Sequence, residues 1–333
     1  KEIVSRRDQV IYSQRSDVPS SANRYLPCVS RPATPLPAPD PPATSLPGVE
    51  PMPLTDLVQH LNHQHNSLPA GRFTARFRSS GDAQVFVHFA NLALESVFLP
   101  IIDTASHRIY GHAATLRVYG LTTGNPVSAD AVFVLPTDDQ EFVYVDRLVR
   151  TLHALSYLAR PLRGTLLLKV NRRHVMSVPS DHGLAFEEIL RSCGLTPQQI
   201  TLELDADGLE DVDHFTRAVT AYRQRGYGIA LSGFGRSSID LSLVRALQPD
   251  VVKFDLLLLV STRPLEGLIE EIHDVGAKVA IEGPNDVQWQ PFAGKTRADL
   301  FQPRQPVERW GSSSQRHPGS AKAALPGKES FSF

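Results

Sequence analysis

The chain has 333 residues, enough for one large domain or two moderate ones with a sizeable core. Its 34 basic and 35 acidic side chains give a formal net charge of -1, which excludes a global attraction to nucleic acid or to an anionic membrane. The two cysteines, Cys28 and Cys193, form neither a disulfide framework nor a metal-binding spacing. We therefore expect a protein of the reducing cytoplasm with no nucleic-acid partner.

The apolar runs of the sequence are short. Residues 166–168 and 256–260 fall far below the roughly 20 residues that span a bilayer, and no signal peptide is recognisable at the start. We expect no membrane segment in this chain. Because the sequence begins with Lys1 rather than Met, we also expect it to be part of a longer polypeptide.

The two ends of the chain differ in composition from its middle. Residues 1–18 contain a basic turn and a short β-rich run, typical of an exposed tail or of the end of an upstream domain. Residues 19–53 are crowded with Pro, Ser and Ala, a composition that buries too little apolar surface to offset the cost of ordering. They are predicted to form a disordered, semi-rigid linker. The hydrophilic residues 308–333 are predicted to form a disordered tail.

Residues 54–93 form a lead-in region. Leu54, Leu57, Val58 and Leu61 have helical spacing, which predicts a short amphipathic helix over residues 54–66. From residue 72 the runs RFTARFR and AQVFVHFA are rich in β-forming residues.

Strands and helices are predicted to alternate from residue 94 to 307. The strand-like segments are FLPIID, YGHAATLRVY, GTLLLKVN, QITLELD, GYGIALSGF, DVVKFD and AKVAIEG. Apolar residues at helical spacing follow three of them, over residues 185–193, 212–222 and 265–275. Such alternation predicts parallel βα units, and their number favours a closed barrel over an open sheet.

Polar residues end four of these apolar strands, namely Asn171, Glu203, Lys253 with Asp255, and Glu282. A single acidic residue after a strand often caps the next helix. Several together indicate a site, because charges inside a barrel mouth need partners or a metal.

The order and spacing of these motifs resemble the EAL domain family, whose members hydrolyse cyclic di-GMP with two divalent metals in a barrel mouth. The resemblance implies a TIM-like (β/α)8 barrel of the EAL type over residues 94–307. KVN matches the family's V-N, which places Asn171 on a metal-binding Asn, and LELDA matches L-E-x-T-E, which places Glu203 on a metal-binding Glu. VVKFD matches L-K-I-D, which places Lys253 on the catalytic lysine and Asp255 on a neighbouring ligand. AIEGPND matches A-E-G-V-E-T and retains Glu282.

Other motif positions have lost their carboxylates. GHAATLR is similar to the family's G-x-E-A-L-x-R, with Ala113 in place of the Glu. ALSGFG stands where the family has A-x-D-D-F-G, so Ser232 and Gly233 replace both aspartates. A two-metal centre needs these carboxylates. The resemblance therefore implies remnant ligands, a remnant catalytic Lys253, no paired metal site and no cofactor.

Binding of the nucleotide is a separate question. Arg117 aligns with a family residue near the nucleotide phosphates, and Arg236 offers a new phosphate contact. Against binding, Leu99 replaces a polar residue of the nucleotide pocket, and Pro284 and Asn285 alter a loop that lines it. The sequence leaves this question open.

We predict a catalytically inactive EAL-domain protein of cyclic di-GMP signalling that acts as a cyclic di-GMP receptor or as a protein-interaction regulator. The resemblance also implies a homodimer. An alternative is an active phosphodiesterase that hydrolyses cyclic di-GMP to pGpG with Mg²⁺ or Mn²⁺. Its unorthodox metal site would be built from Asn171, Glu203, Asp255, Glu282 and either Asp205 or Asp207. A third interpretation is a decaying gene product without a maintained role. The segment KEIVSRRDQVIY is similar to the closing segment of a GGDEF domain, which favours the C-terminal part of a GGDEF–EAL protein.

Overall fold

The structure is a computed structural model that describes residues 53–67, 74–79, 84–234, 241–255, 265–283 and 296–304. All of them belong to the compact unit Pro47–Phe333, which is distinct from the unit Lys1–Leu46. The predictions made for residues 1–18, for the Pro-rich segment up to residue 52 and for the tail 308–333 therefore lie outside the described residues.

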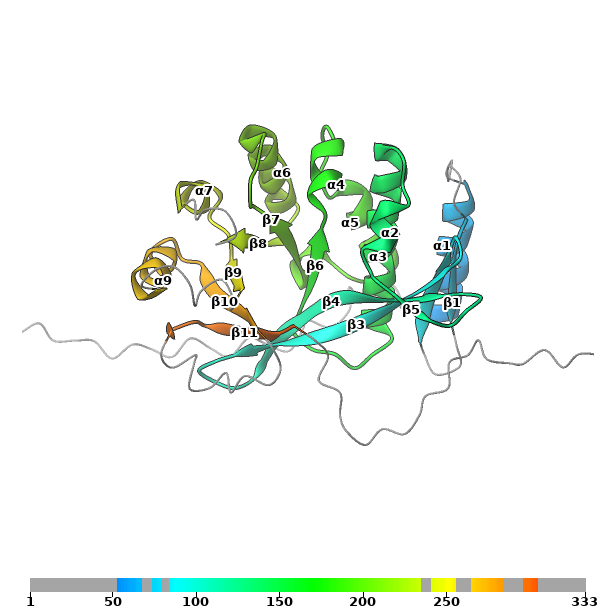
Figure 1. The fold of residues 1–333 in the computed structure, drawn as a ribbon, viewed down its shortest axis with the longest axis horizontal. Helices are drawn as coiled ribbons and strands as arrows, with labels where there is room; N and C mark the ends of the chain where they lie inside the picture. Colours follow the sequence, from blue (N-terminus) through cyan, green and yellow to red (C-terminus); the bar gives the residue numbers. More distant parts are fainter. Residues whose placement is uncertain are drawn as a thin grey trace, which may run out of the picture. The chain divides into compact units, whose positions relative to one another are not determined.

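Eight strands close into a barrel (Figure 1). They are β3 (Leu92–Asp103), β4 (Ile109–Gly120), β6 (Thr165–Val170), β7 (Ile200–Asp205), β8 (Gly228–Phe234), β9 (Val251–Asp255), β10 (Lys278–Gly283) and β11 (Leu300–Pro303). Neighbouring strands pair in parallel from β4 to β11, whereas β3 pairs antiparallel with both β4 and β11 and so completes the ring. The predicted barrel is confirmed; β11, which the sequence patterns did not indicate as a strand, is part of it.

Apolar residues fill both sides of the strands, as expected where helices cover the outside of a parallel barrel. The interior holds one cluster of buried side chains: Leu99, Ile101, Ala113, Leu167, Ala230, Val251, Ala280 and Leu300. The alternate strand residues point outward into the larger cluster beneath the helices. Three of the interior residues are alanines, whose small side chains leave space for the larger ones inside the closed barrel.

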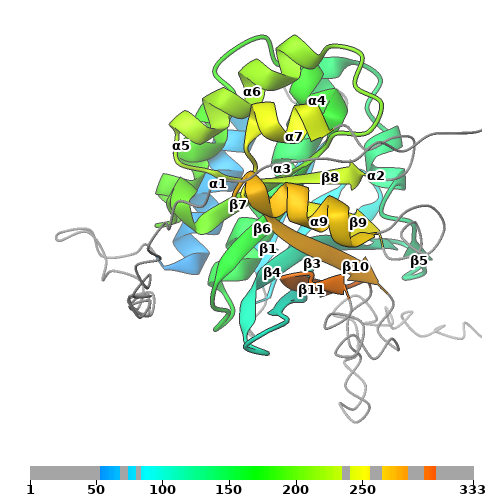
Figure 2. The ribbon, with the colours of Figure 1, turned by 90° about the vertical axis from the view of Figure 1, so that its left-hand side faces the viewer.

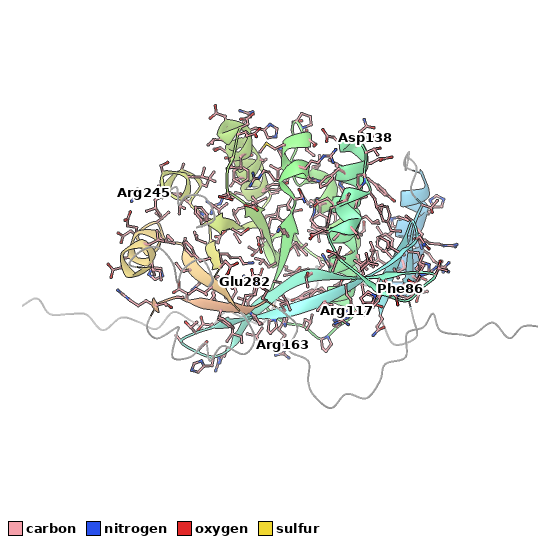
Figure 3. The ribbon with its side chains drawn as sticks, viewed as in Figure 1. Phe86, Arg117, Asp138, Arg163, Arg245 and Glu282 are labelled. Carbon is pink, nitrogen blue, oxygen red and sulfur yellow. The ribbon has the colours of Figure 1, made fainter. Side chains whose placement is uncertain are left out.

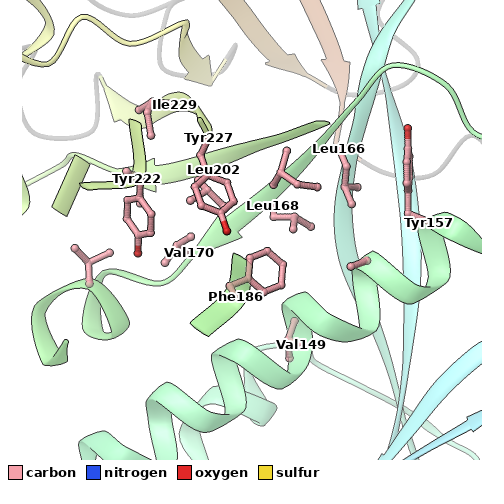
Figure 4. Packing of buried hydrophobic residues seen from close by; sticks show 14 of the residues in the cluster. Val149, Tyr157, Leu166, Leu168, Val170, Phe186, Leu202, Tyr222, Tyr227 and Ile229 are labelled. Atoms are coloured by element: carbon pink, nitrogen blue, oxygen red, sulfur yellow. The ribbon is translucent and has the colours of Figure 1, made fainter. Parts of the chain in front are cut away.

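The helices form the outer layer (Figures 1 and 2). They are α2 (Ala131–Val134), α3 (Asp139–Leu158), α4 (Arg172–Ser177), α5 (Leu184–Ser192), α6 (Val212–Gln224), α7 (Leu241–Leu247) and α9 (Leu265–Asp274), with a 3-10 turn at Pro197–Gln199. Three of them, α5, α6 and α9, are the helices that apolar spacing predicted. Figure 4 shows Val149 of α3 and Phe186 of α5 near Leu168 of β6 in the shared core. None of the described helices combines the length and apolarity needed to cross a bilayer.

A buried ionic cluster joins α3 to α4 below the end of β6. Asp146 accepts a hydrogen bond from Arg150 at 3.1 Å and lies 3.1 Å from Nδ1 of His174. Its other oxygen accepts from the main-chain N–H of Asn171 at 3.1 Å. Burial, reinforced by the Arg150 charge, lowers the pKa of His174 to about 2, so this ring is neutral. The cluster thus fixes the turn at which β6 ends and α4 begins.

The lead-in region extends the barrel sheet beyond β3. Helix α1 (Leu54–Ser67) precedes β1 (Ala75–Ser79) and β2 (Val85–Phe89), which add antiparallel strands in the order β1-β2-β3, while β5 (Pro126–Val127) pairs with β4. At the β1 edge of this sheet, the side chain of Asn62 forms the hydrogen bonds that a neighbouring strand would form. The Asn62 amide donates to the Phe77 carbonyl at 2.9 Å and accepts from the Phe77 N–H at 2.7 Å. Helix α1 therefore supplies hydrogen-bond partners to the main-chain N–H and C=O groups of Phe77 at the edge of the sheet.

We predict that Asn62→Ala lowers the free energy of unfolding by about 1–3 kcal/mol, because two main-chain groups of Phe77 lose their partner. Urea unfolding and amide hydrogen exchange at residue 77 measure the effect. Asn125→Ala is the matched control, since Asn125 is an exposed turn residue. Equal stability of the two variants would contradict the role given to Asn62.

Candidate functional site

The C-terminal ends of the parallel strands form the barrel mouth, where sites of such folds lie. Lys253 of β9 lies between two carboxylates there. Its Nζ atom is 2.5 Å from Oε2 of Glu203 on β7 and 3.5 Å from Oε2 of Glu282 on β10. Figure 3 shows Glu282 at the end of its strand. The structure therefore brings together three residues that the sequence placed at separate strand ends.

The pair formed by Lys253 and Glu203 is buried, with 5% and 9% of each residue exposed. Burial alone would raise the pKa of Glu203, but the charge and hydrogen bond of Lys253, the charge of Lys169 and the Ser232 hydroxyl together lower it below its ordinary value. Glu203 is therefore a carboxylate whose counter-ion is a side chain of the protein. Breaking such a pair leaves an uncompensated buried charge.

A second cation, Arg304, completes the mouth. It follows β11, and its main-chain N–H donates to the Gly283 carbonyl at 2.8 Å. Its guanidinium forms an ion pair with Asp255 and lies 3.6 Å from Oε1 of Glu282. No sequence motif singled out Arg304; the available signal was a basic residue directly after the last barrel strand. The three acidic residues of the site thus share two cations.

Asn171, the fourth residue that the sequence predicts as a remnant ligand, has a different set of contacts. Its side-chain oxygen accepts from the Arg173 N–H at 3.0 Å and caps α4. Its main-chain N–H is bound by Asp146. These hydrogen bonds join Asn171 to α4 and α3 rather than to the carboxylates around Lys253.

The three positions without carboxylates lie on the barrel strands β4 and β8. Ala113 belongs to the interior cluster, and Ser232 is buried beside Glu203. Gly233 lies in an irregularity of the β8–β9 pairing and has a φ of +89°, a conformation that suits glycine. A Cβ atom on residue 233 would collide with the carboxylate of Asp205. That carboxylate accepts from the Asp207 N–H at 3.0 Å and pairs with Arg172 at 3.4 Å.

Of the two residues predicted to contact phosphate, only Arg117 lies in the described part of the chain. Arg117 is exposed on β4, directly opposite Glu95 of β3. It lies on the same strand face as Ala113, so it continues the interior face toward the mouth. Arg236, together with Pro284 and Asn285, lies outside the described residues.

The donors at the mouth do not fit a paired metal centre. The remaining carboxylates are engaged by Lys253 and Arg304, and positions 113, 232 and 233 supply no ligand charge. Within the described ranges, no group of three or more His, Cys, Asp or Glu side chains is arranged to hold a metal ion.

A hollow of about 450 Å³ lies elsewhere, between α4 and the start of α6. It is lined by Arg172, Arg173, Met176, Gly208, Glu210, Asp211 and His214. Its charged groups serve local structure, because Arg172 binds the Gly208 carbonyl at 3.0 Å and Asp211 accepts from the His214 N–H at 2.8 Å. The mouth, rather than this hollow, carries the residues that the sequence motifs indicated.

An α/β barrel with acidic and basic side chains at the C-terminal ends of its strands defines the class of this protein. A family model described as the EAL domain matches residues 83–302. The chain belongs to the EAL domain family, as its motifs predicted.

The individual relatives that match this chain either share little sequence identity with it or match only a short part of it. The uncharacterized EAL-domain containing protein YkuI of Bacillus subtilis (strain 168) is 31% identical over 88 residues, which are 25% of this chain and 22% of YkuI. The solved structure of YkuI with its substrate cyclic di-GMP and calcium has a TM-score of 0.54 and 20% identity, covering 63% of this chain and 54% of that chain. Klebsiella pneumoniae BlrP1 with manganese and cyclic di-GMP has a TM-score of 0.53 and 20% identity, covering 70% and 57%. The chain thus spans little more than half the length of these structures, and the likeness to them shows the fold.

We predict that Gly233→Ala lowers the free energy of unfolding by about 2–5 kcal/mol, from the positive φ and from the collision with Asp205. Gly194→Ala is the matched control: Gly194 has a φ of +70° and open space around its Cβ position, so it should cost only about 1–2 kcal/mol. In a double-mutant cycle, Asp205→Ala should reduce the cost of Gly233→Ala. Strictly additive effects of the two substitutions would contradict a collision between a side chain at residue 233 and Asp205.

We also predict that Lys253→Met lowers the free energy of unfolding by about 3–5 kcal/mol at pH 7, because Glu203 is left charged and buried without its partner. In the wild type the lowered pKa of Glu203 stabilises the fold above the unfolded-state pKa, and this stabilisation is lost as the pH falls through the folded-state pKa. In Lys253→Met burial raises that pKa, so the variant's deficit should shrink in acid.

Urea unfolding between pH 4 and pH 8 measures this pH dependence. The control is Glu203→Gln/Lys253→Met, which removes both charges and should be closer to the wild type at pH 7. A deficit of Lys253→Met that does not change with pH would contradict the assignment.

Proposed function

We propose that this protein is a catalytically inactive EAL-domain protein of cyclic di-GMP signalling that acts by binding, as a cyclic di-GMP receptor or as a protein-interaction regulator. The observation that carries the proposal is the pairing of Glu203, Glu282 and Asp255 with Lys253 and Arg304. Each of these carboxylates already has a side-chain cation as its counter-ion, so the charge of the mouth is balanced without a metal ion.

Hydrolysis by this family rests on two divalent metals, which activate water and neutralise the developing charge on phosphorus. The arrangement here supports the loss of that chemistry in two ways. The carboxylates expected at positions 113, 232 and 233 are absent, and the collision at Gly233 opposes a side chain there. Lys253, the remnant of the catalytic lysine, is only 5% exposed and paired with Glu203, so it serves the charge balance of the mouth.

The choice between receptor and protein-interaction regulator depends on charge. The network of Glu203, Asp255, Glu282, Lys253 and Arg304 combines three acidic with two basic groups, so it adds no attraction for the phosphates of a cyclic dinucleotide. Receptor function therefore depends on Arg117, the exposed guanidinium on the β4 face that leads to the mouth. That YkuI and BlrP1 have been solved with cyclic di-GMP supports testing this ligand first.

If the domain does not bind the nucleotide, the remaining role is interaction with a partner protein or with a second copy of the chain. We propose the cytoplasm as the site of action, since Cys193 is a buried free thiol.

We predict that the purified chain releases no pGpG from cyclic di-GMP with Mg²⁺ or Mn²⁺. Turnover that depends on either metal would replace the proposal by the alternative, an active phosphodiesterase. Calorimetric titration with cyclic di-GMP, with and without Mg²⁺, then distinguishes the two binding roles.

For a receptor, Arg117→Ala should weaken binding at least tenfold, as expected for the loss of a charge-assisted phosphate contact. Arg163→Ala is the matched control, because Arg163 is an exposed arginine just before β6, at the opposite end of that strand from the mouth (Figure 3). No heat at millimolar nucleotide would leave the protein-interaction role. An equal loss in both variants would contradict the assignment of Arg117.

A further inference from the structure

The antiparallel part of the sheet, which the lead-in strands extend, has one face in the core and one in contact with solvent. Alternate residues of β1, β2 and β3 point into the apolar core that these strands share with α1 and α3. The residues between them lie on the opposite face and are exposed or half-buried. We call this set the outer sheet face; it consists of Arg76, Arg78, Phe86, His88, Ala93, Glu95, Arg117 and Tyr119.

Strand register places each arginine of β1 beside a ring of β2. Arg78 is the register partner of Phe86, and Arg76 is the register partner of His88. The two rings are themselves neighbours, with centroids 5.3 Å apart and planes inclined at 46°. Figure 3 shows Phe86 well separated from Glu282 at the barrel mouth. Two cations and two rings therefore alternate on a part of the sheet that is distinct from the mouth.

The charges of β1 are not balanced within the described part of the chain. Neither guanidinium of that strand forms an ion pair or a hydrogen bond with a described residue. Glu95, the acidic member of the outer sheet face, lies directly opposite Arg117 of β4. Burial and the charge of Arg78 lower the pKa of His88, so this ring is neutral at pH 7. Two uncompensated positive charges therefore remain beside two uncharged rings.

We propose that the outer sheet face binds single-stranded nucleic acid, with Arg76 and Arg78 on the phosphates and the bases stacked on Phe86 and His88. Guanidinium groups bind phosphate oxygens through charge-assisted hydrogen bonds. Bases of a single strand are free to stack on aromatic side chains, whereas those of a duplex are not. An acidic peptide would be bound by the cations alone and would give no reason for a ring beside each.

No nucleic-acid partner is expected from the net charge of -1, because that charge provides no long-range attraction. The proposal replaces this expectation with a local one, since the two arginines of β1 act only at contact distance. It also goes beyond the proposed function, because it assigns a ligand to strands added to the barrel and makes no use of the mouth.

The test measures the fluorescence anisotropy of labelled oligonucleotides of about 12 nucleotides with the full 333-residue chain. Oligo(U) and oligo(dT) are the single-stranded probes, and their relative affinities tell whether RNA or DNA is preferred. We expect both to bind about tenfold more tightly than a duplex of the same length, because only single strands offer bases to the rings. Absence of single-strand binding at low salt, or equal binding of the duplex, would overturn the proposal.

Substitutions separate the roles of the rings and the cations. Phe86→Ala should weaken single-strand binding by about fivefold to a hundredfold without changing its salt dependence. Arg76→Ala and Arg78→Ala should each reduce the slope of log affinity against log salt by about 0.7, as expected for one lost phosphate contact. Phe86→Tyr keeps a ring and should bind like the wild type. If Phe86→Ala does not fold, Phe86→Leu keeps the apolar volume and must show the same loss.

Two matched controls lie on other surfaces. Arg163→Ala removes an exposed arginine just before β6, and Phe133→Ala removes a half-buried ring on α2. Neither should change the affinity for single strands, and a loss equal to that of the β1 and β2 variants would contradict the assignment. Displacement of the oligonucleotide by oligoglutamate of equal charge would instead identify the face as a site for acidic proteins and overturn the proposal. None of these results depends on whether the mouth binds cyclic di-GMP.

Discussion

Charge balance at the end of a closed barrel is the constraint on which the rest of the site depends. Strands β7, β9 and β10 bring Glu203, Lys253 and Glu282 to within ion-pair distance, in a space that the interior cluster closes from below. An acid placed there needs a partner, because water cannot fully solvate it. Lys253 supplies that partner from inside the barrel, and Arg304 supplies another from its rim. The local geometry of the mouth follows from these two cations.

The helical layer contributes indirectly, by fixing where each strand ends. The cluster of Asp146, Arg150 and His174 ties α3 to α4 and binds the main chain at Asn171. With its N–H held by Asp146 and its side chain capping α4, Asn171 fixes the junction between strand and helix. Similarly, Arg172 fixes the segment after β7 through Asp205 and the Gly208 carbonyl. Residues that sequence motifs associate with ligands can thus be retained for the turns that they stabilise.

The barrel could be predicted from the sequence because its signal is local. Runs such as LLLKV and ITLEL are largely apolar on both faces and are followed by a polar residue, which is typical of strands buried between an interior and a helical layer. Helix α3 lacked such a clear signal, since its buried residues include Asp146, Arg150 and His153 among the apolar ones. Their polarity interrupts the apolar stripe, and their burial depends on tertiary partners that the local sequence does not show.

The contacts of the site could not be predicted in the same way. That Arg304 pairs with Asp255, about fifty positions earlier in the sequence, depends on β11 lying beside β10 and on β10 lying beside β9. The positive φ of Gly233 and the approach of Asp205 depend on the irregular pairing at the end of β8. Both are properties of strand register across the barrel, which no local pattern encodes.

Loss of metal ligands leaves a barrel mouth with a physical problem, because every carboxylate that persists there must still be neutralised. A protein can delete the charge or provide a permanent cation, and this chain does both. Ala113, Ser232 and Gly233 carry no charge, while Glu203, Glu282 and Asp255 are matched by Lys253 and Arg304. Unselected decay would remove ligands without regard to the charges left behind. The matching of charges between β7, β9, β10 and the residue after β11 instead favours a mouth maintained in charge balance, which is the condition that the proposed binding role requires.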